Sequence, residues 1–526
     1  MPKHFNTAGP CKADIHYMLS SLDRLPTLGS LIDQQGYFVI HAPRQTGKTT
    51  VMMALAQQLT ESGNYTAIVL SVETGAAFKH DPVLAEKYII RSWIGTSKVT
   101  LPGELQPPKL RDIQEEMGLL DPRDLDIKTY LQAWTLASPR PLVVFLDEID
   151  SLEDETLITV LRQLRAGFPL RPHGFPHSLA LIGVRDVRDY KVASGGSLRL
   201  NTASPFNIKL ESFTLSNFTL TEVSALYQQH TEATGQVFLP EAVALVFHLT
   251  QGQPWLVNAI ARQLVEVLVT DPTQPITVDD VTQAKELIIQ RQETHLDSLV
   301  KRLREPEIQA IFEPMLSGDE LGNIPEDDVQ LLLDLGLCRL QNGSSLQVAN
   351  PIYKEIIPRV LAYVTTASLP APSISPRWLN PDGSLNPEAL LDSFLDFWRQ
   401  HGEPLLKSAP YHEIAPHIVL MAFLHRVVNG GGTLEREYAI GSGRMDICLR
   451  YGAVVMGMEL KVWKPGKKDP LPQGLQQLDK YLAGLGLDTG WLVIFDRRPD
   501  LLPIEERTTT EEVVSPGDRA IVVIRG

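Results

Sequence analysis

A loop whose residue types suit phosphate binding follows an apolar run near the start of the sequence. The run Tyr37 to His41 leads into Ala-Pro-Arg-Gln-Thr-Gly-Lys-Thr, residues 42–49, and a helix-like stretch follows. Backbone N–H groups at a helix N-terminus converge on anions, so a loop in this place can hold phosphates. We expect Lys48 to reach the β- and γ-phosphates and the Thr49 hydroxyl to bind Mg²⁺. The predicted nucleotide-binding residues are Pro43, Arg44, Gln45, Thr46, Gly47, Lys48, Thr49 and Thr50.

The loop departs from the Walker A pattern at Ala42, where that pattern has its first glycine. We expect the Ala42 methyl group to lie at the mouth of the loop, at a modest cost. Gly47 and Lys48, which supply close backbone approach and charge, are both present.

Acidic residues end a second apolar run, Pro141 to Leu146, which Asp147 and Glu148 follow directly. Ligands of open α/β sheets bind at the carboxyl ends of the strands. We therefore expect Asp147 to hold Mg²⁺ through water and Glu148 to orient or activate the attacking water. Arg185, after the apolar run Ser178 to Val184, is in the right place to sense the γ-phosphate.

A second group of chemically capable residues lies near the C-terminus. Glu459 and Lys461 are two residues apart in a strand-like run, so their side chains share one face. Asp446, on the preceding strand-like run, can meet them. Two carboxylates that hold Mg²⁺ and a lysine beside the reacting phosphate are the minimum for metal-assisted phosphodiester hydrolysis. Lys464, Lys467 and Lys468 follow at once, and we expect them to contact phosphate, a solvated turn being the alternative.

Composition limits the partners of the chain. Its 526 residues carry 48 Lys plus Arg against 63 Asp plus Glu, a net charge of −15. Bulk electrostatics therefore disfavours nucleic-acid binding by the whole molecule, and any DNA contact must be local. The apolar runs are of strand length, so we expect no membrane partner and a cytoplasmic protein. The sequence does not decide the oligomeric state, and a homo-oligomer stays open.

These residues require an α/β multidomain chain. Strand-like and helix-like runs alternate over 1–214, which predicts a parallel-sheet P-loop core, and helices follow over 215–294. Residues 295–364 suggest a winged helix. Because its helix is acidic and would be repelled by DNA phosphates, we expect it to pack against the protein rather than to bind DNA. A Pro-rich linker over 365–376 precedes a second α/β domain over 377–526.

With these motifs in place, residues 1 to about 365 resemble the AAA-like and STAND ATPases of the archaeal-ATPase type. The resemblance implies that ATP is the cofactor, with Mg²⁺, and that helical and winged-helix subdomains form a lid. It also implies that Pro254, in Gly252-Gln253-Pro254, contacts the nucleotide.

The C-terminal domain resembles the PD-(D/E)XK nuclease superfamily, with a restriction-endonuclease-like fold. Glu459-Leu460-Lys461 matches the E-x-K element, and Met445-Asp446 stands where the motif has Pro-Asp. The resemblance implies Mg²⁺ ligation by Asp446 and Glu459 and a helix glutamate, Glu413, on an amphipathic helix from Tyr411 to Val428. Further along the chain, Gln477 and Tyr481 match the Q-x-x-x-Y element, which contacts substrate.

The sequence thus predicts an ATP-binding switch joined to a Mg²⁺-dependent nuclease that acts on DNA. By resemblance to fusions of an ATPase with a nuclease, this combination implies defence against foreign DNA or control of mobile elements. Two alternatives remain: a signalling or scaffold ATPase whose nuclease-like domain only binds nucleic acid or protein, and a DNA motor. The sequence contains no helicase motif beyond the Walker elements, and the ATPase half contains no run of basic residues. Both observations argue against the motor.

Overall fold

The computed structural model describes most of the chain. The residues outside the description are 1–2, 21–23, 119–120, 122–123, 186–207, 292–302, 304, 306–307, 310, 313–314, 316–323, 342–344, 358–376, 409–414, 429–431 and 438–445. The predicted linker and Glu413 therefore lie outside the described residues. The chain divides into two compact units, Met1–Arg291 with Val329–Arg339, and Gln292–Asp328 with Leu340–Gly526. Each unit is described by itself.

A parallel sheet of five strands forms the centre of the first unit, in the order β2-β3-β4-β1-β5. The strands are β1 (Tyr37–His41), β2 (Thr66–Ser71), β3 (Leu142–Asp147), β4 (Ser178–Gly183) and β5 (Glu211–Thr214). Strands β1, β3 and β4 confirm the three apolar runs predicted above. The short edge strand β5 was not predicted, because its side chains are exposed or half-buried and give no apolar run.

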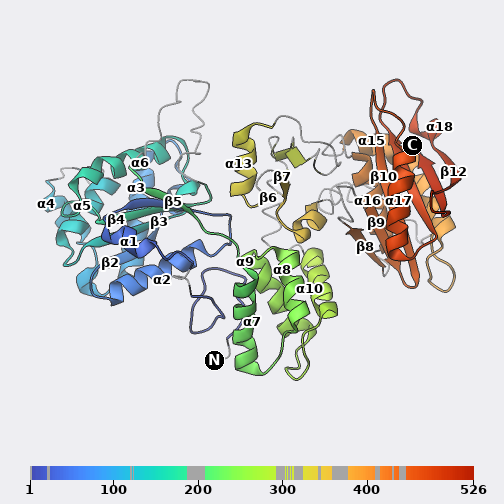
Figure 1. Ribbon diagram of the computed structural model, residues 1–526. Coiled ribbons are helices and arrows are strands. Elements are labelled where there is room, and N and C mark those ends of the chain that lie inside the picture. The colour runs from blue at the N-terminus through green and yellow to red at the C-terminus, as the bar shows by residue number, and fades with distance from the viewer. Residues whose placement is uncertain are drawn as a thin grey trace. The chain divides into compact units, whose positions relative to one another are not determined.

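Helices cover both faces of this sheet (Figure 1). Alternate residues of each strand point to opposite faces, so Tyr37 and Val39 enter one core while Phe38 and Ile40 enter the other. The second core also contains apolar residues of α1 (Leu28–Asp33) and α2 (Lys48–Glu61). Helices α3 (Pro82–Thr100), α4 (Leu110–Glu116), α5 (Ile127–Ala137) and α6 (Asp154–Gly167) supply the first core. The parallel α/β P-loop fold is confirmed.

A helical subdomain follows the sheet. It consists of α7 (Leu220–Thr234), α8 (Pro240–Thr250), α9 (Pro254–Gln263) and α10 (Val278–Arg291). Helix α9 ends at Gln263, and a π-helical turn, Leu264–Leu268, follows it. Further on, α13 (Glu326–Asp334) precedes the two-stranded sheet of β6 (Cys338–Gln341) and β7 (Ser345–Val348).

The second unit contains a mixed sheet of six strands in the order β12-β13-β11-β10-β9-β8. The strands are β8 (Gly432–Glu437), β9 (Asp446–Tyr451), β10 (Val454–Trp463), β11 (Thr489–Asp496), β12 (Thr509–Val514) and β13 (Ala520–Arg525). Strands β10, β11 and β13 are parallel, and the other pairs are antiparallel. The two strand-like runs predicted to carry Asp446 and Glu459 are β9 and β10, which form an antiparallel hairpin that turns at Gly452 and Ala453.

Helix α17 (Leu471–Leu485) packs on one face of this sheet, where it shares a core with β11 and β13. Phe495 of β11, on the other face, contacts Trp398 of α15 (Pro387–Ser408) and His417 of α16 (Ala415–Val428). The short helix α18 (Ile504–Arg507) follows β11. The predicted helix is present as α16 and ends at Val428 as expected. The prediction that it is amphipathic was wrong, because its residues from Ala415 to Leu424 are all buried.

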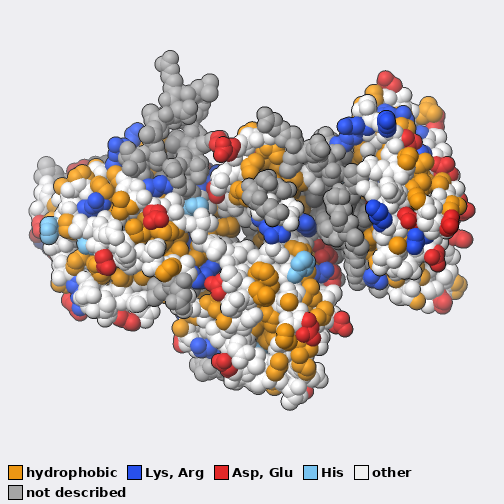
Figure 2. All heavy atoms as spheres, viewed as in Figure 1, with side chains coloured by type: hydrophobic (Ala, Val, Ile, Leu, Met, Phe, Trp, Pro, Cys, Tyr) orange, Lys and Arg blue, Asp and Glu red, His pale blue; other side chains and the backbone are white. Residues whose placement is uncertain are grey.

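One face of the molecule shows how charged side chains are distributed over the ATPase core. On the face shown in Figure 2, acidic and basic side chains are interspersed over the ATPase core, without a continuous basic area among the residues drawn in colour. Among the described residues, no helix has both the length and the apolar composition that crossing a bilayer requires.

Candidate nucleotide site and a buried carboxylate–lysine pair

The loop after β1 has the backbone of a phosphate cradle. Gly47 has φ 91° and Gln45 has φ 60°, so the chain turns through the left-handed region before α2 begins at Lys48. A Cβ atom at position 47 would meet no other group, so the backbone angle, not space, is the reason for glycine there. The amide groups of the loop are thereby gathered at the N-terminus of α2, where anions bind.

The Ala42 side chain does not lie at the mouth of this loop, contrary to expectation. Ala42 is fully buried in the core with Val51 and Phe145, and its N–H donates to Gly183 O at 3.2 Å. The residue thus continues the pairing of β1 with β4. Its methyl group adds to the core and takes no space from a phosphate, so this departure from the Walker A pattern costs little.

The Lys48 ammonium is hydrogen-bonded to neutral backbone carbonyls of the loop. Its Nζ donates to two loop carbonyls, Ala42 O at 2.8 Å and Pro43 O at 3.0 Å. Burial lowers the pKa of Lys48, and the carboxylates of Asp150, Glu148 and Asp147 oppose that shift. Neutral carbonyl partners only partly replace lost water, so a phosphate oxygen would be a stronger acceptor for this ammonium.

The metal-binding oxygens predicted from the sequence lie together. Thr49 Oγ1 donates to Asp147 Oδ2 at 2.6 Å, and Asp147 Oδ1 accepts the Glu148 N–H at 2.9 Å. A hydroxyl and a carboxylate side by side are hard oxygen ligands of the kind Mg²⁺ takes at phosphates. The residues therefore fit the group, and bound Mg²⁺ would neutralise charge developing on the phosphate oxygens.

Glu148 is held in an unusual backbone conformation beside this pair, with φ 57°. Burial raises the pKa of Glu148, and its neighbours Asp147 and Asp150 raise it further. A raised pKa moves a carboxylate toward the range in which it can accept a proton from water. Backbone strain and a shifted pKa together support the predicted role of Glu148 at the attacking water.

Sequence reasoning missed a third carboxylate of this site. Asp150 Oδ1 accepts the Val184 N–H at 3.1 Å and so ties the end of β3 to the end of β4. Val184 lines the cavity at the loop, whereas Arg185, the next residue, is half-buried and is not one of the described lining residues. The γ-phosphate role of Arg185 stays a prediction.

A cavity of about 460 Å³ extends from the phosphate loop to the helical subdomain. One wall is the N-terminal strap, by which we mean residues 3–19, and another is the first turn of α9, including Pro254. The strap was missed because its residues have no helical or strand period. It is tied to the loop by the Cys11 N–H, which donates to Thr50 Oγ1 at 3.0 Å.

Further contacts join the strap to the helical subdomain. Trp255 Nε1 donates to Thr7 O at 2.9 Å, and Gln229 exchanges two hydrogen bonds with the Met18 backbone. Arg24, just beyond the strap, is half-buried and pairs with Glu222 at 3.4 Å. Hydrogen bonds therefore connect the strap both to the start of α2 and to the helical subdomain.

Comparison with known proteins agrees with this site. The P-loop fold and its paired Walker elements define a P-loop ATPase. Residues 26–357 match the family model described as the AAA-like domain, and the chain belongs to this family. The chain is an ATPase whose cofactors are ATP and Mg²⁺. No curated protein matches it.

Three solved structures are similar to this chain at low sequence identity. The Walker-type ATPase of Pyrococcus abyssi has 12% identity and a TM-score of 0.45, over 66% of this chain and 98% of that one. The Thermotoga maritima RuvB Holliday junction branch migration motor has 14% identity and a TM-score of 0.34, over 63% and 91%. The Aeropyrum pernix ORC2 protein has 11% identity and a TM-score of 0.34, over 65% and 91%.

Gly252, two residues before α9, allows a test of how the cavity wall is built. Its φ is +71°, and a Cβ atom there would lie 1.8 Å from the backbone oxygen of Phe218. We expect Gly252→Ala to lower the free energy of unfolding by at least about 3 kcal/mol, since the backbone must move and strain adds to the clash. Denaturant titration of the purified chain would measure this.

Gly235→Ala is the matched control. Gly235 also has positive φ, +82°, but its Cβ would meet nothing within 4 Å. The control should lose only the conformational cost of about 1 to 2 kcal/mol. Equal losses in both variants would contradict the close approach of Gly252 to Phe218.

The second group of predicted residues is placed on β9, β10 and α17. Glu459 stands opposite Asp446 in the antiparallel register, although the Asp446 side chain lies outside the description. Glu459 is fully buried, Lys461 is 8% exposed, and the Lys461 ammonium donates to Glu459 Oε1. A lysine and a glutamate this deeply buried are rare unless paired.

Gln477 and Tyr481 lie on the helix that covers the same face. A Cβ at Gly457, two residues before Glu459, would lie 3.2 Å from the Tyr481 ring. Gln477 Oε1 is buried and has no hydrogen-bond partner among the described residues. The described residues contain no group of three or more His, Cys, Asp or Glu arranged to hold a metal ion. Fitting Mg²⁺ here therefore depends on Asp446, the residue whose side chain is outside the description.

Proposed function

We propose that this ATPase is a nucleotide-controlled switch whose C-terminal unit is a Mg²⁺-dependent nuclease of the PD-(D/E)XK type, acting on DNA. The buried Glu459–Lys461 pair, with Asp446 opposite it in the register, carries the proposal. Moving two charges out of water costs several kcal/mol per ion before they pair. Apolar residues of similar volume would therefore stabilise the fold at least as well as this ion pair does. Metal-assisted phosphodiester cleavage uses a carboxylate and an ammonium in a site that excludes water, which would explain why this pair is buried.

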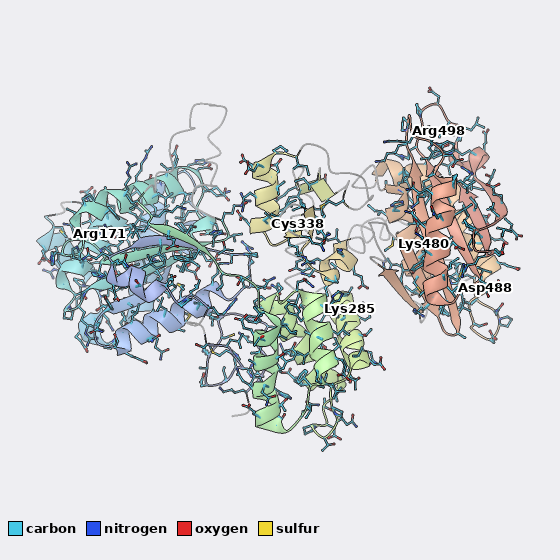
Figure 3. The ribbon with its side chains drawn as sticks, in the orientation of Figure 1. Arg171, Lys285, Cys338, Lys480, Asp488 and Arg498 are labelled. Atoms are coloured by element: carbon cyan, nitrogen blue, oxygen red, sulfur yellow. The ribbon has the colours of Figure 1, made fainter. Side chains whose placement is uncertain are left out.

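The end of β10 supports a nucleic-acid substrate. The Arg498 guanidinium lies 3.6 Å from the centre of the Trp463 ring, and Lys467 and Lys468 on the next loop are exposed. Arg525, at the end of β13, is 5.8 Å from the same ring. Parallel strands thus bring cations to one edge of the sheet, beside the strand that carries Glu459 and Lys461. Arg498 is labelled in Figure 3.

The cations of this edge are partly balanced. Arg498 pairs with Asp496 at 2.6 Å, and Arg525 pairs with Asp469 at 3.0 Å. Contact with a phosphate backbone would therefore be local, as a chain with a net charge of −15 requires. The proposal includes a cytoplasmic protein, a winged helix over part of 295–364, a possible homo-oligomer and a role in defence against foreign DNA.

Incubation of the purified chain with plasmid and linear DNA tests the proposal. We expect cleavage that requires Mg²⁺ and stops with a chelator. DNA binding without cleavage, at any nucleotide and Mg²⁺ concentration, would instead favour the scaffold alternative.

Control by nucleotide is tested by Glu148→Gln. Glutamine keeps the shape of Glu148 but cannot accept a proton, so this variant should bind ATP and hydrolyse it slowly. If the two ATPase states differ in their effect on the nuclease, cleavage in ATP should differ from the parent rate by about fivefold or more, in a direction left open. Identical cleavage rates in ATP, in ADP, without nucleotide and in the variant would show two domains that are merely tethered.

A further inference from the structure

Strands β3 and β4 stop pairing before β4 ends. The last residues paired between them are Leu146 and Leu181, although β4 continues to Gly183. The Gly183 carbonyl accepts the Ala42 N–H from the side of β1. The carbonyl and the N–H of one trans peptide point in opposite directions, so the next N–H, that of Val184, points to the side of β3. Val184 is buried, and its N–H therefore needs an acceptor beyond the paired part of β3.

Asp150 supplies this acceptor. Its Oδ1 accepts the Val184 N–H at 3.1 Å, as a carbonyl of β3 would in a longer strand pair. Asp150 lies in the 3₁₀ turn Ile149–Ser151 that follows β3, and the last N–H of this turn donates to Glu148 O at 2.9 Å. The first residue of the turn is fully buried in the core. The side chain of Asp150 therefore anchors the turn that begins at Glu148 to the end of β4.

This anchor matters for Glu148 because the backbone there is strained. Its φ of 57° lies in the left-handed region, which a residue with a Cβ atom rarely adopts unless its surroundings hold it. Asp147, the residue before, is held from β2, since Asp147 O accepts the Val72 N–H at 3.1 Å. Asp150, two residues after, is held at β4. Contacts on both sides thus fix the direction in which the Glu148 side chain leaves the backbone.

Both ends of this connection reach the nucleotide cavity. Glu148 and Val184 line it at the phosphate loop. The hydrogen bond of Asp150 therefore relates two parts of the cavity wall, one of which carries the carboxylate expected at the attacking water. A general base acts only within hydrogen-bond reach of that water, so a small shift of the turn should slow hydrolysis. Phosphate binding is expected from other groups, Lys48 and the amides of the loop.

We propose that Asp150 is a positioning residue for ATP hydrolysis, which through its hydrogen bond to Val184 holds Glu148 where that carboxylate meets the attacking water. In this role Asp150 acts only through Glu148. The inference rests on the predicted role of Glu148 in the ATPase reaction. It goes beyond the proposed switch and is independent of the proposed nuclease.

Steady-state hydrolysis and equilibrium binding of ATP, both with Mg²⁺, test the proposal. Asp150→Ala removes the acceptor and should lower kcat at least about tenfold, while the dissociation constant for ATP stays within about threefold of the parent value. Asp150→Asn removes the charge but keeps an oxygen that can accept the Val184 N–H, so it should recover most of the lost rate. Asp112→Ala, at an exposed position of α4, is the matched control and should hydrolyse ATP as the parent does.

A double-variant cycle separates positioning of Glu148 from a general structural role. In a Glu148→Gln chain the base is already lost, so adding Asp150→Ala should lower the single-turnover rate by less than about twofold. A further tenfold loss there would overturn the proposal, and so would parental kcat in a folded Asp150→Ala chain or equal losses in the alanine and asparagine variants. If Asp150→Ala does not fold, Asp150→Glu takes its place, because its longer side chain must displace the turn, and an unchanged kcat in that variant would also overturn the proposal.

Discussion

Lys48→Ala should raise the dissociation constant for ATP at least about 100-fold. The Nζ of Lys48 now donates to Ala42 O and Pro43 O, at the centre of the loop that holds the phosphates. A hydrogen bond from a cation to a charged group contributes about 1.5 to 3 kcal/mol, and the Coulomb attraction of the lysine for several phosphate oxygens adds to it. Equilibrium binding of a fluorescent ATP analogue would measure the change.

The fold should survive this substitution. Pro43 O keeps a second donor, the Thr46 hydroxyl at 2.9 Å, and the core residues around the loop are untouched. Lys98→Ala, at an exposed position of α3, removes the same charge away from the site and should bind ATP as the parent does. A folded Lys48→Ala chain with parental affinity would refute the nucleotide site.

Neutralising the buried pair of the second unit should lower DNA cleavage at least about 100-fold. Removing one partner alone is a poor test, because a single uncompensated charge at Glu459 or Lys461 would destabilise the domain by about 3 to 5 kcal/mol. The double variant Glu459→Gln with Lys461→Met replaces both charges by neutral groups of similar shape. It should fold, keep ATP binding and lose the electrostatic stabilisation that phosphodiester cleavage needs.

A second variant and a control accompany this one. Asp446→Asn, on the strand opposite Glu459, should lower cleavage to a similar extent through loss of a metal ligand. Lys480→Met, at an exposed position of α17 labelled in Figure 3, removes a lysine of the same domain outside the pair and should cut DNA normally. Parental cleavage by the double variant and by Asp446→Asn would rule out the nuclease and favour a binding module.

Local patterns were enough to predict the phosphate loop, its partner strand and the hairpin of the second unit. A glycine, a lysine and a threonine between a strand and a helix have one geometry, because backbone sterics and the helix N-terminus decide where the amides point. The run from Leu142 to Asp147 is buried throughout, as its apolar residues predict. Side-chain alternation likewise placed Glu459 and Lys461 together on one face.

The strap and Asp150 could not be predicted in the same way. Each acts through a partner distant in sequence, as Cys11 does with Thr50, or Asp150 with Val184. Ala42 was misjudged for a related reason, since only the neighbouring strand β4 shows that its methyl group enters the core. Such contacts leave no periodic trace, because neither partner changes the local preference of its own segment.

The sequence by itself therefore determined the chemistry available to this protein: a Walker loop, paired carboxylates at the end of β3, and a Glu-x-Lys strand. The tertiary structure alone decided which of these side chains are buried or paired, as with Glu459 and Lys461, and which backbone is strained, as with the left-handed conformation of Glu148. The physical reason is that residue type and spacing act over a few residues. Burial, and with it each shift in pKa and each unmet hydrogen bond, is a property of the packed chain.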